Sequence, residues 1–337
     1  MTADPALSVE DLSVQFRTRS GVVHALDNVS FSLAKGETLA LVGESGSGKS
    51  VTAYAVMGIL DSAGRVTGGR AMLGDLDLLS ATPKQLADVR GRKIAMIFQN
   101  PRTALNPIRT VGRQIADMLI RHGGVSRRAA PAHAVEMLRA VGITDPARRA
   151  KAYPFEMSGG MCQRVMIAIA LAAKPSLLIA DEPTTGLDVT TQAVIMDLIG
   201  DLASDLGMAT IFITHDLALA GQRSSRIVVM HAGHVVENAQ TKDLFANPRH
   251  PYTAELIAAT PDSAQNLDAL SAIPGSLPDL RRADLPPCRY SERCPRKVAA
   301  CAQPLPQAAP GASHIVACWN ALPDRAQAAY PPAVSAA

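Results

Sequence analysis

The fold of this chain is decided by residues 38–50, Thr38-Leu39-Ala40-Leu41-Val42-Gly43-Glu44-Ser45-Gly46-Ser47-Gly48-Lys49-Ser50. An apolar strand, Thr38–Val42, comes first, and a helix-compatible run, 51–60, follows. Residues 43–50 match the phosphate-loop pattern G-x-x-x-x-G-K-[ST], and the strand before it and the helix after it distinguish such a loop from an incidental Gly/Ser turn. The sequence therefore predicts a phosphate-binding loop in an α/β fold.

Each part of this loop has a chemical reason. Glycines let backbone N–H groups turn inward around phosphates, and the N-terminus of the following helix favours negative charge. The lysine can reach the β- and γ-phosphates, and the serine hydroxyl can ligate Mg²⁺. The predicted ATP-binding residues here are Gly43, Ser45, Gly46, Ser47, Gly48, Lys49 and Ser50.

A second signal lies at residues 177–182, where an apolar run ends in Asp181 and Glu182. A buried strand with this pattern delivers two carboxylates to its C-terminal end, where α/β sheets bind ligands. Asp181 is predicted to hold Mg²⁺, and Glu182 to polarise an attacking water. The alternative is that the two acids only cap a helix.

A third signal is Ser158-Gly159-Gly160, which begins a predicted helix over Gly159–Ala172. Serine is a good N-cap, and two glycines leave backbone N–H groups open to an anion. Taken alone, the tripeptide would be an ordinary helix start.

The order of these motifs along residues 7–245 resembles the ATP-binding cassette (ABC) family, since three further motifs stand where that family has them. They are Gln99 at the end of a strand, Gly186-Leu187-Asp188, and Thr214-His215-Asp216. The resemblance implies a P-loop NTPase with the ABC-cassette fold: a mostly parallel core sheet, an antiparallel β subdomain and an inserted helical subdomain over about 100–172.

The resemblance also assigns roles. It implies that Gln99 senses Mg²⁺ and takes part in catalysis, that Asp188 works across a dimer interface, and that His215 contacts the γ-phosphate. Phe16 resembles the aromatic residue that stacks on adenine, although a core phenylalanine is the alternative. Ser158, Gly159 and Gly160 are implied to touch the ATP held by a second cassette.

One motif departs from the family pattern. The signature usually reads Leu-Ser-Gly-Gly-Gln, whereas here it is Met157-Ser158-Gly159-Gly160-Met161, with Gln163 two places later. The serine and both glycines remain, so hydrolysis is still expected, but its rate is open.

The remaining elements are expected as an α/β alternation. We expect strands at Leu12–Phe16, Val29–Leu33, Thr38–Val42, Ile94–Phe98, Leu177–Ala180, Ala209–Ile213, Ile227–Met230 and His234–Glu237. We expect helices from Lys49 and at Thr110–Arg121, Pro131–Ala140, Gly159–Ala172 and Thr190–Leu206. The domains are predicted as a nucleotide-binding domain, 1–245, a C-terminal extension, 246–322, and a disordered tail, 323–337.

Composition limits the partners. The 337 residues are 47% hydrophobic and 19% charged, with a net charge of +3, so no nucleic-acid partner is expected. No apolar run approaches the length that crosses a bilayer, and the N-terminus lacks a secretory signal pattern. Residues 102–151 hold ten Lys/Arg against three Asp/Glu, which fits either a solvated helical surface or a face for a membrane partner.

Four of the five cysteines crowd together in an extension that is expected to be irregular: Cys288, Cys294, Cys301 and Cys318. The C-x2–4-C pairs of structural zinc sites are absent, which favours an iron–sulfur cluster, while unligated thiols remain an alternative. The run Asn247–Thr253 and these cysteines resemble the C-terminal extension of oligopeptide/dipeptide-type importer ATPases, some of which carry a [4Fe–4S] cluster there.

By this resemblance the chain is expected to be an ATPase that uses ATP and Mg²⁺ to power import of peptides or related solutes from the cytoplasmic face of the membrane. The implied partners are a second ABC ATPase subunit, two transmembrane permease subunits and an extracytoplasmic solute-binding protein. The alternatives are a soluble non-transport ABC ATPase and an ATP-binding Fe–S regulatory subunit. The transported solute cannot be read from this chain.

Overall fold

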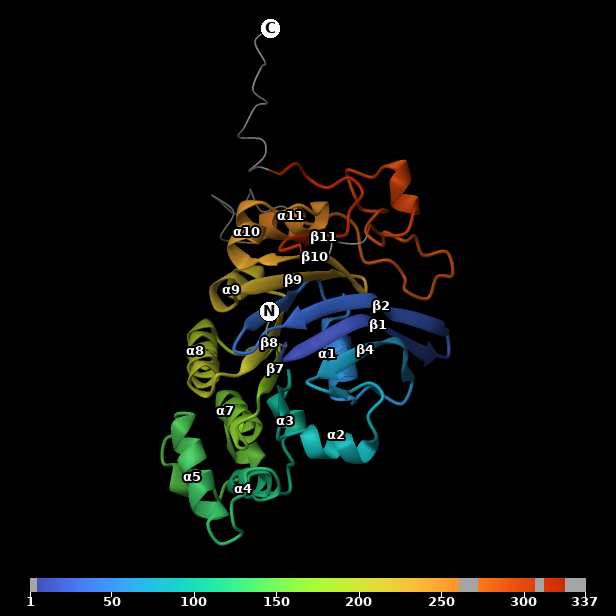
Figure 1. Cartoon of the computed structure of the whole chain (residues 1–337). Coiled ribbons are helices and arrows are strands. Elements are labelled where there is room, and N and C mark those ends of the chain that lie inside the picture. Colours follow the sequence, from blue (N-terminus) through green and yellow to red (C-terminus); the bar gives the residue numbers. More distant parts are fainter. Residues whose placement is uncertain (1–4, 261–271, 307–311, 325–337) are drawn as a thin grey trace.

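The computed structural model describes residues 5–260, 272–306 and 312–324 (Figure 1). The strands are β1 (Leu7–Thr18), β2 (Gly21–Leu33), β3 (Thr38–Val42), β4 (Gly64–Leu73), β5 (Leu76–Asp77), β6 (Ile94–Ile97), β7 (Leu177–Asp181), β8 (Ala209–Thr214), β9 (Arg226–His231), β10 (His234–Gln240) and β11 (Ile315–Val316).

The α-helices are α1 (Lys49–Met57), α2 (Pro83–Val89), α3 (Pro101–Ala104), α4 (Val111–Arg121), α5 (Ala130–Ala140), α6 (Pro146–Arg149), α7 (Gly159–Leu171), α8 (Val189–Leu206), α9 (Leu217–Arg223), α10 (Thr241–Ala246) and α11 (Pro251–Ala258). Short 3₁₀ helices lie at η1 (Pro154–Glu156) and η4 (Ala299–Ala302). None of the described helices combines the length and the apolar character needed to cross a membrane.

The central sheet has the strand order β11-β10-β9-β3-β8-β7-β6. Strand β3 pairs in parallel with β8 and β9, and β7 pairs in parallel with β6 and β8. Strands β10 and β11 run antiparallel at one edge. Because the phosphate loop follows β3, it leaves the sheet at the carboxyl end of a central strand, where α/β sheets bind ligands.

A second sheet, with the order β2-β1-β4-β5, is antiparallel throughout. It lies beside α1 in Figure 1. Helices α3–α7 follow β6 and form the lower part of the molecule in this view, below the central sheet. The long stretch without strands in the sequence is therefore a group of helices inserted between β6 and β7.

Side chains on the two faces of the central sheet pack into two separate hydrophobic cores. Along β3, Ala40 and Val42 pack with the inserted helices and α8, whereas Leu39 and Leu41 pack with α1 and the antiparallel sheet. This alternation follows from the period of two along a strand, and it lets a continuous apolar run be buried on both sides.

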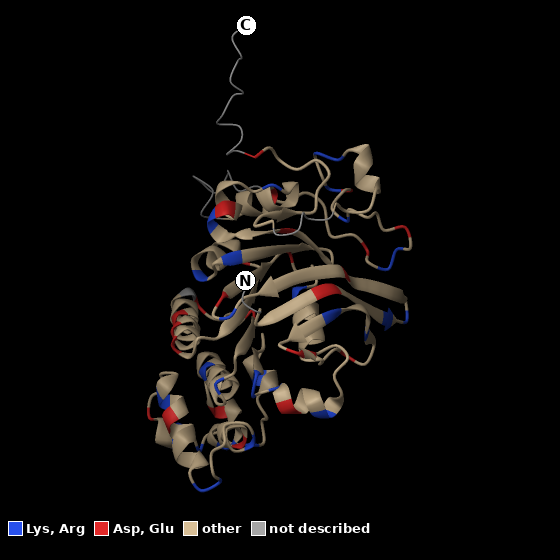
Figure 2. Ribbon diagram, in the orientation of Figure 1, with Lys and Arg blue, Asp and Glu red and all other residues tan. Residues whose placement is uncertain are grey.

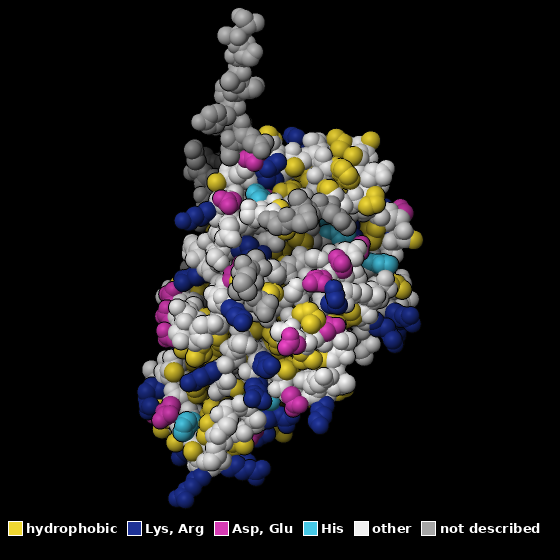
Figure 3. Space-filling model, viewed as in Figure 1, with side chains coloured by type: hydrophobic (Ala, Val, Ile, Leu, Met, Phe, Trp, Pro, Cys, Tyr) yellow, Lys and Arg dark blue, Asp and Glu magenta, His cyan; other side chains and the backbone are white. Residues whose placement is uncertain are grey.

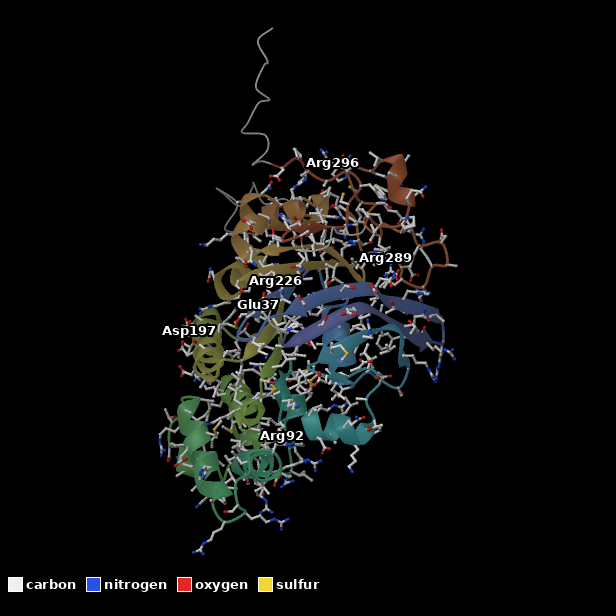
Figure 4. All side chains as sticks on the ribbon, in the orientation of Figure 1. Glu37, Arg92, Asp197, Arg226, Arg289 and Arg296 are labelled. Carbon is white, nitrogen blue, oxygen red and sulfur yellow. The ribbon has the colours of Figure 1, made fainter. Side chains whose placement is uncertain are left out.

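A mostly buried ion pair connects the residue that precedes β3 with the first residue of the neighbouring strand β9. Arg226 Nε on β9 lies 2.7 Å from Glu37 Oε1, and both side chains are 14% exposed. Figure 4 shows the two residues side by side. Since a paired guanidinium and carboxylate tolerate burial far better than either would alone, this pair helps to fix β9 beside β3.

All eight predicted strands are present, but β1 and β2 are much longer than expected, and β4 and the two-residue β5 were not predicted. Most of β4 is exposed, so it has no apolar alternation to detect. Six helices were also not predicted, and all six are eight residues or fewer: α2, α3, α6, α9, α10 and α11. The predicted disordered tail lies, from residue 325 on, outside the described residues.

The extension is less irregular than predicted. It contains α11, and its strand β11 pairs with β10 and so extends the central sheet. Two-residue strands are too short for a periodic signal, which is why the sequence did not reveal β11.

Candidate functional site: the nucleotide cleft

The phosphate loop has a backbone that only glycine adopts easily. Gly43, Gly46 and Gly48 have φ angles of 148°, 84° and 104°. A Cβ on Gly43 would lie 2.1 Å from the carbonyl oxygen of Met230, so a side chain there would collide with backbone. These glycines therefore set the loop geometry that the motif predicted.

Lys49 is held inside this loop. Its Nζ donates hydrogen bonds to the carbonyl oxygens of Gly43 at 2.8 Å and Glu44 at 3.0 Å. Burial lowers the pKa of Lys49, while the negative charges of Glu182 and Asp181 act in the opposite direction. A desolvated ammonium at the start of a helix is suited to bind a polyphosphate.

Asp181 and Ser50 form the pair expected at a Mg²⁺ site. Ser50 Oγ donates to Asp181 Oδ1 at 2.9 Å. The other oxygen, Asp181 Oδ2, is buried and has no hydrogen-bond partner among the described residues. Burial raises the pKa of Asp181, so a nearby cation would stabilise its charged form. An orphaned carboxylate oxygen beside a serine hydroxyl fits a divalent ion that prefers oxygen ligands.

The Glu182 carboxylate contacts three side chains, two of which come from distant parts of the chain. Its Oε2 accepts hydrogen bonds from Gln99 Nε2 at 2.7 Å and from Thr185 Oγ1 at 2.8 Å, and its Oε1 lies 3.3 Å from His215 Nδ1. Burial would raise the pKa of Glu182, but the hydrogen bonds of Thr185 and His215 hold it below its usual value. Glu182 is thus a carboxylate at neutral pH, available as a proton acceptor.

The backbone at Glu182 is also unusual, because its φ of 44° lies in the left-handed region. Non-glycine residues adopt this conformation at a cost, and such strain gathers at functional positions. Here it turns the carboxylate from the end of β7 toward Gln99 and His215.

The cleft around these groups has a volume of about 510 Å³. Its lining includes these predicted site residues: Phe16, Ser45, Gly46, Gly48, Lys49, Ser50, Gln99 and Glu182. The structure therefore brings together predicted residues from four segments of the chain: Phe16, the phosphate loop, Gln99 and Glu182. Asp181 adjoins the cleft through Ser50.

Eight predicted residues are not part of this lining within the described structure. Gly43, Ser47, Asp181 and His215 contact residues that are, whereas Ser158, Gly159, Gly160 and Asp188 cap or begin helices away from it. Ser158 caps α7, with its Oγ accepting from the N–H of Met161 at 3.3 Å. Asp188 caps α8 by accepting from the N–H and the hydroxyl of Thr191, which lower its pKa. Both caps face outward, because Ser158 and Asp188 are exposed. Gln163 is buried and so does not replace the glutamine missing at position 161.

Residues of the C-terminal extension contact the phosphate loop, and these contacts were not predicted from the sequence. The N–H of Glu44 donates to Tyr252 Oη at 3.0 Å, and the Glu44 carboxylate pairs with Arg293 at 2.8 Å. Leu280 of the extension lines the cleft itself. No sequence signal could have shown the pair of Glu44 and Arg293, since 249 residues separate them.

The four cysteines of the extension are free, and so is Cys162. Burial raises the pKa of Cys288 to about 11, with smaller contributions from Cys301, Cys318 and Cys294, so the four thiols lie within electrostatic reach of one another. Within the described ranges, however, no three His, Cys, Asp or Glu side chains converge as metal ligands. The sequence prediction of a cluster is therefore not supported by a ready ligand geometry.

Comparison with known families agrees with this geometry. Residues 26–185 match the family model described as ABC transporter, and residues 236–301 match the one described as oligopeptide/dipeptide transporter, C-terminal region. A probable peptide ABC transporter ATP-binding protein of Sinorhizobium fredii is 48% identical over 323 residues, which are 94% of this chain and 96% of that protein. The chain belongs to the family of ABC transporter ATP-binding proteins.

Other members of the family are nearly as similar to this ABC ATPase. The dipeptide transport ATP-binding protein DppD of Bacillus subtilis is 45% identical over 94% of this chain and 95% of its own length. The oligopeptide transport ATP-binding protein AppD of the same organism is 46% identical over 88% of this chain and 90% of its own length.

Solved ABC cassettes share the fold. A dimeric cassette in a post-hydrolysis state with ADP and phosphate has a TM-score of 0.63 and 28% identity, covering 70% of this chain and 98% of that one. A cassette of Clostridium perfringens, part of the CbiONQ transporter complex, has a TM-score of 0.60 and 27% identity, covering 72% of this chain and 91% of that one.

Proposed function

We propose that this chain is the ATP-hydrolysing subunit of a peptide importer and acts at the cytoplasmic face of the membrane. The observation that carries the proposal is the presence, in one chain, of the nucleotide cleft and of a C-terminal region of the oligopeptide/dipeptide transporter type. Relatives named as peptide transport ATP-binding proteins align along nearly the whole chain, which supports the substrate class.

The cleft residues would share the chemistry as follows. Lys49 and the loop N–H groups bind the β- and γ-phosphates, and Ser50 and Asp181 hold Mg²⁺, which would neutralise charge on those phosphates. Glu182 accepts the proton of the attacking water, oriented by its hydrogen bond from Gln99. His215 lies at the rim, 63% exposed, from where it can contact a γ-phosphate. The ring of Phe16, which lines the cleft, would stack on the adenine.

A second cassette would complete the site. Ser158, Gly159, Gly160 and Asp188 lie outside the cleft of their own chain, and the two helix N-termini that they begin present N–H groups to an anion. We propose that they contact the ATP bound by the partner ATPase, so that ATP joins the two subunits and hydrolysis releases them.

The domains follow from this division. Residues 1–245 would form the nucleotide-binding domain, and 246–322 the extension. The helical insert carries a cationic surface, and Figures 2 and 3 show Lys and Arg at the lower end of the molecule over these helices. This surface suits the proposed permease contact.

The test of this function is recovery of the assembly. The chain would be tagged, extracted gently from native membranes, and its companions identified by mass spectrometry. Two multi-span permeases and a second ATPase are expected, together with a solute-binding protein that indicates the solute. Recovery of a lone chain, or of ribosomal or DNA-repair proteins, would support a soluble ABC ATPase in its place.

We further propose that Cys288, Cys294, Cys301 and Cys318 hold a [4Fe–4S] cluster. What supports this is their donor chemistry: four free thiols within electrostatic reach of one another, two of them buried. Closely placed thiolates repel one another unless a cation lies between them. Their side chains would have to turn inward from the positions described here, because these form no ligand group.

Anaerobic purification followed by iron and sulfide analysis tests the cluster. About four iron and four sulfide ions per chain are expected for a [4Fe–4S] cluster. Cys288→Ser should lose most of the iron, whereas Cys162→Ser, a buried cysteine in α7, should retain it. Tightly bound zinc without iron would refute the assignment. A purely regulatory Fe–S role for the chain would further require that the loaded protein bind ATP without turnover.

A further inference from the structure

Leu280 belongs to the C-terminal extension, yet it lines the nucleotide cleft together with Phe16 and Val23. Phe16 and Val23 are cross-strand neighbours on β1 and β2. These three side chains are the largest apolar groups of the lining apart from Val51, while most of its polar groups belong to the phosphate loop, Gln99 and Glu182. A cleft with one apolar and one polar end matches a nucleotide, whose base is flat and apolar on its faces and whose phosphates are charged.

The segment that carries Leu280 runs along this cleft. At one end, Leu277 packs on the phosphate loop, since a Cβ placed on Gly46 would lie 3.2 Å from Leu277 Cδ1. At the other end, the carbonyl of Leu280 accepts a hydrogen bond from the N–H of His24 on β2 at 2.9 Å. Three residue steps span at most about 10 Å, enough to follow a nucleotide from its phosphates toward its base.

Hydrogen bonds hold the segment in this place. Arg281 Nη1 donates to Ser20 Oγ at 3.1 Å, and Arg293 Nε donates to the carbonyl of Pro274 at 2.7 Å. Arg289, labelled in Figure 4, donates to the carbonyl of His24 at 3.0 Å and pairs with Asp27. Because Arg293 holds the backbone at Pro274, before Leu280, and Arg281 binds the β1–β2 hairpin directly after it, the side chain of Leu280 is presented to the cleft by a fixed backbone.

We propose that Leu280 is a nucleotide-binding residue that packs on the base or ribose of ATP opposite Phe16. The C-terminal extension then forms part of the ATP site, and it raises affinity for the nucleoside without touching the phosphates. This inference rests on the proposed function, because it presupposes that the cleft binds ATP.

The experiment measures equilibrium binding by titration calorimetry on the full chain, with Mg-ATP and with inorganic tripolyphosphate as ligands. In Leu280→Ala, the Kd for ATP should rise roughly 5- to 30-fold, since part of an apolar contact is lost. The Kd for tripolyphosphate, which has no base or ribose, should change by less than about twofold. Leu280→Met keeps an apolar side chain of similar volume and should bind ATP almost as the unmodified chain does.

Leu285→Ala is the matched control, because Leu285 is a half-buried leucine of the same extension that does not line the cleft. It should leave both affinities unchanged. The proposal is overturned if Leu280→Ala binds ATP as tightly as the unmodified chain, or if it loses ATP and tripolyphosphate equally, which would show a general disturbance of the loop. If the unmodified chain binds no ATP, the proposed function itself fails, which is a different result.

Discussion

Replacing Lys49 by alanine is expected to weaken ATP binding roughly 100- to 1,000-fold and to abolish hydrolysis, since each charge-assisted hydrogen bond to phosphate contributes about 1.5–3 kcal/mol. Its ammonium is already desolvated, with the side chain 5% exposed inside the phosphate loop. Few water molecules must therefore be displaced when phosphate oxygens accept hydrogen bonds from this ammonium. Equilibrium binding of Mg-ATP to the purified chain measures the loss.

The matched control is Lys242→Ala, which removes an exposed lysine of α10 that does not line the cleft. This variant should bind ATP normally. If Lys49→Ala retained ATP affinity within a few-fold of the unmodified chain, the loop would not be the phosphate site.

Replacing Glu182 by glutamine should leave ATP binding intact and slow hydrolysis roughly 10²- to 10⁴-fold, the usual contribution of a general base. The amide oxygen can still accept the hydrogen bonds from Gln99 and Thr185, so the local geometry is kept. What disappears is the negative charge that draws a proton from water. Single-turnover hydrolysis and ATP binding, measured on the same preparation, separate the two effects.

For this variant the control is Glu136→Gln, an exposed glutamate in α5 whose loss should not change turnover. Because the variant keeps ATP without cleaving it, the ATP-bound assembly of two ATPase subunits should accumulate. Ordinary turnover in Glu182→Gln would mean that another group activates the water.

The central elements could be predicted from local sequence because their signals are local. Strand β3, the glycines of the phosphate loop and the start of α1 form one continuous run, and each glycine has the backbone conformation that its place requires. Strand β4 escaped prediction for the opposite reason: it is mostly exposed, and Gly68 and Gly69 interrupt it. Its place in the sheet is set by pairing with β1, which no single-sequence pattern reports.

The site shows the same division. Asp181 and Glu182 were predicted because an apolar strand leads into them, and Gln99 and His215 because the order of motifs resembles a known family. The contacts from the extension depend on chain folding over long distances: Tyr252 lies 208 residues from Glu44, its hydrogen-bond donor. For the four cysteines, an iron–sulfur cluster was predicted from their number and spacing, but a ligand geometry for it does not appear among the described residues.

Photolabelling of the full chain with 2-azido-ATP, followed by mapping of the labelled residues by mass spectrometry, tests directly whether this cleft is the ATP site. The azide lies on the base, so the label should appear next to the apolar part of the lining, in 16–25 or 277–281, and excess ATP should prevent it. Labelling outside these two segments, or labelling that ATP does not compete away, would show that the base of ATP is bound elsewhere.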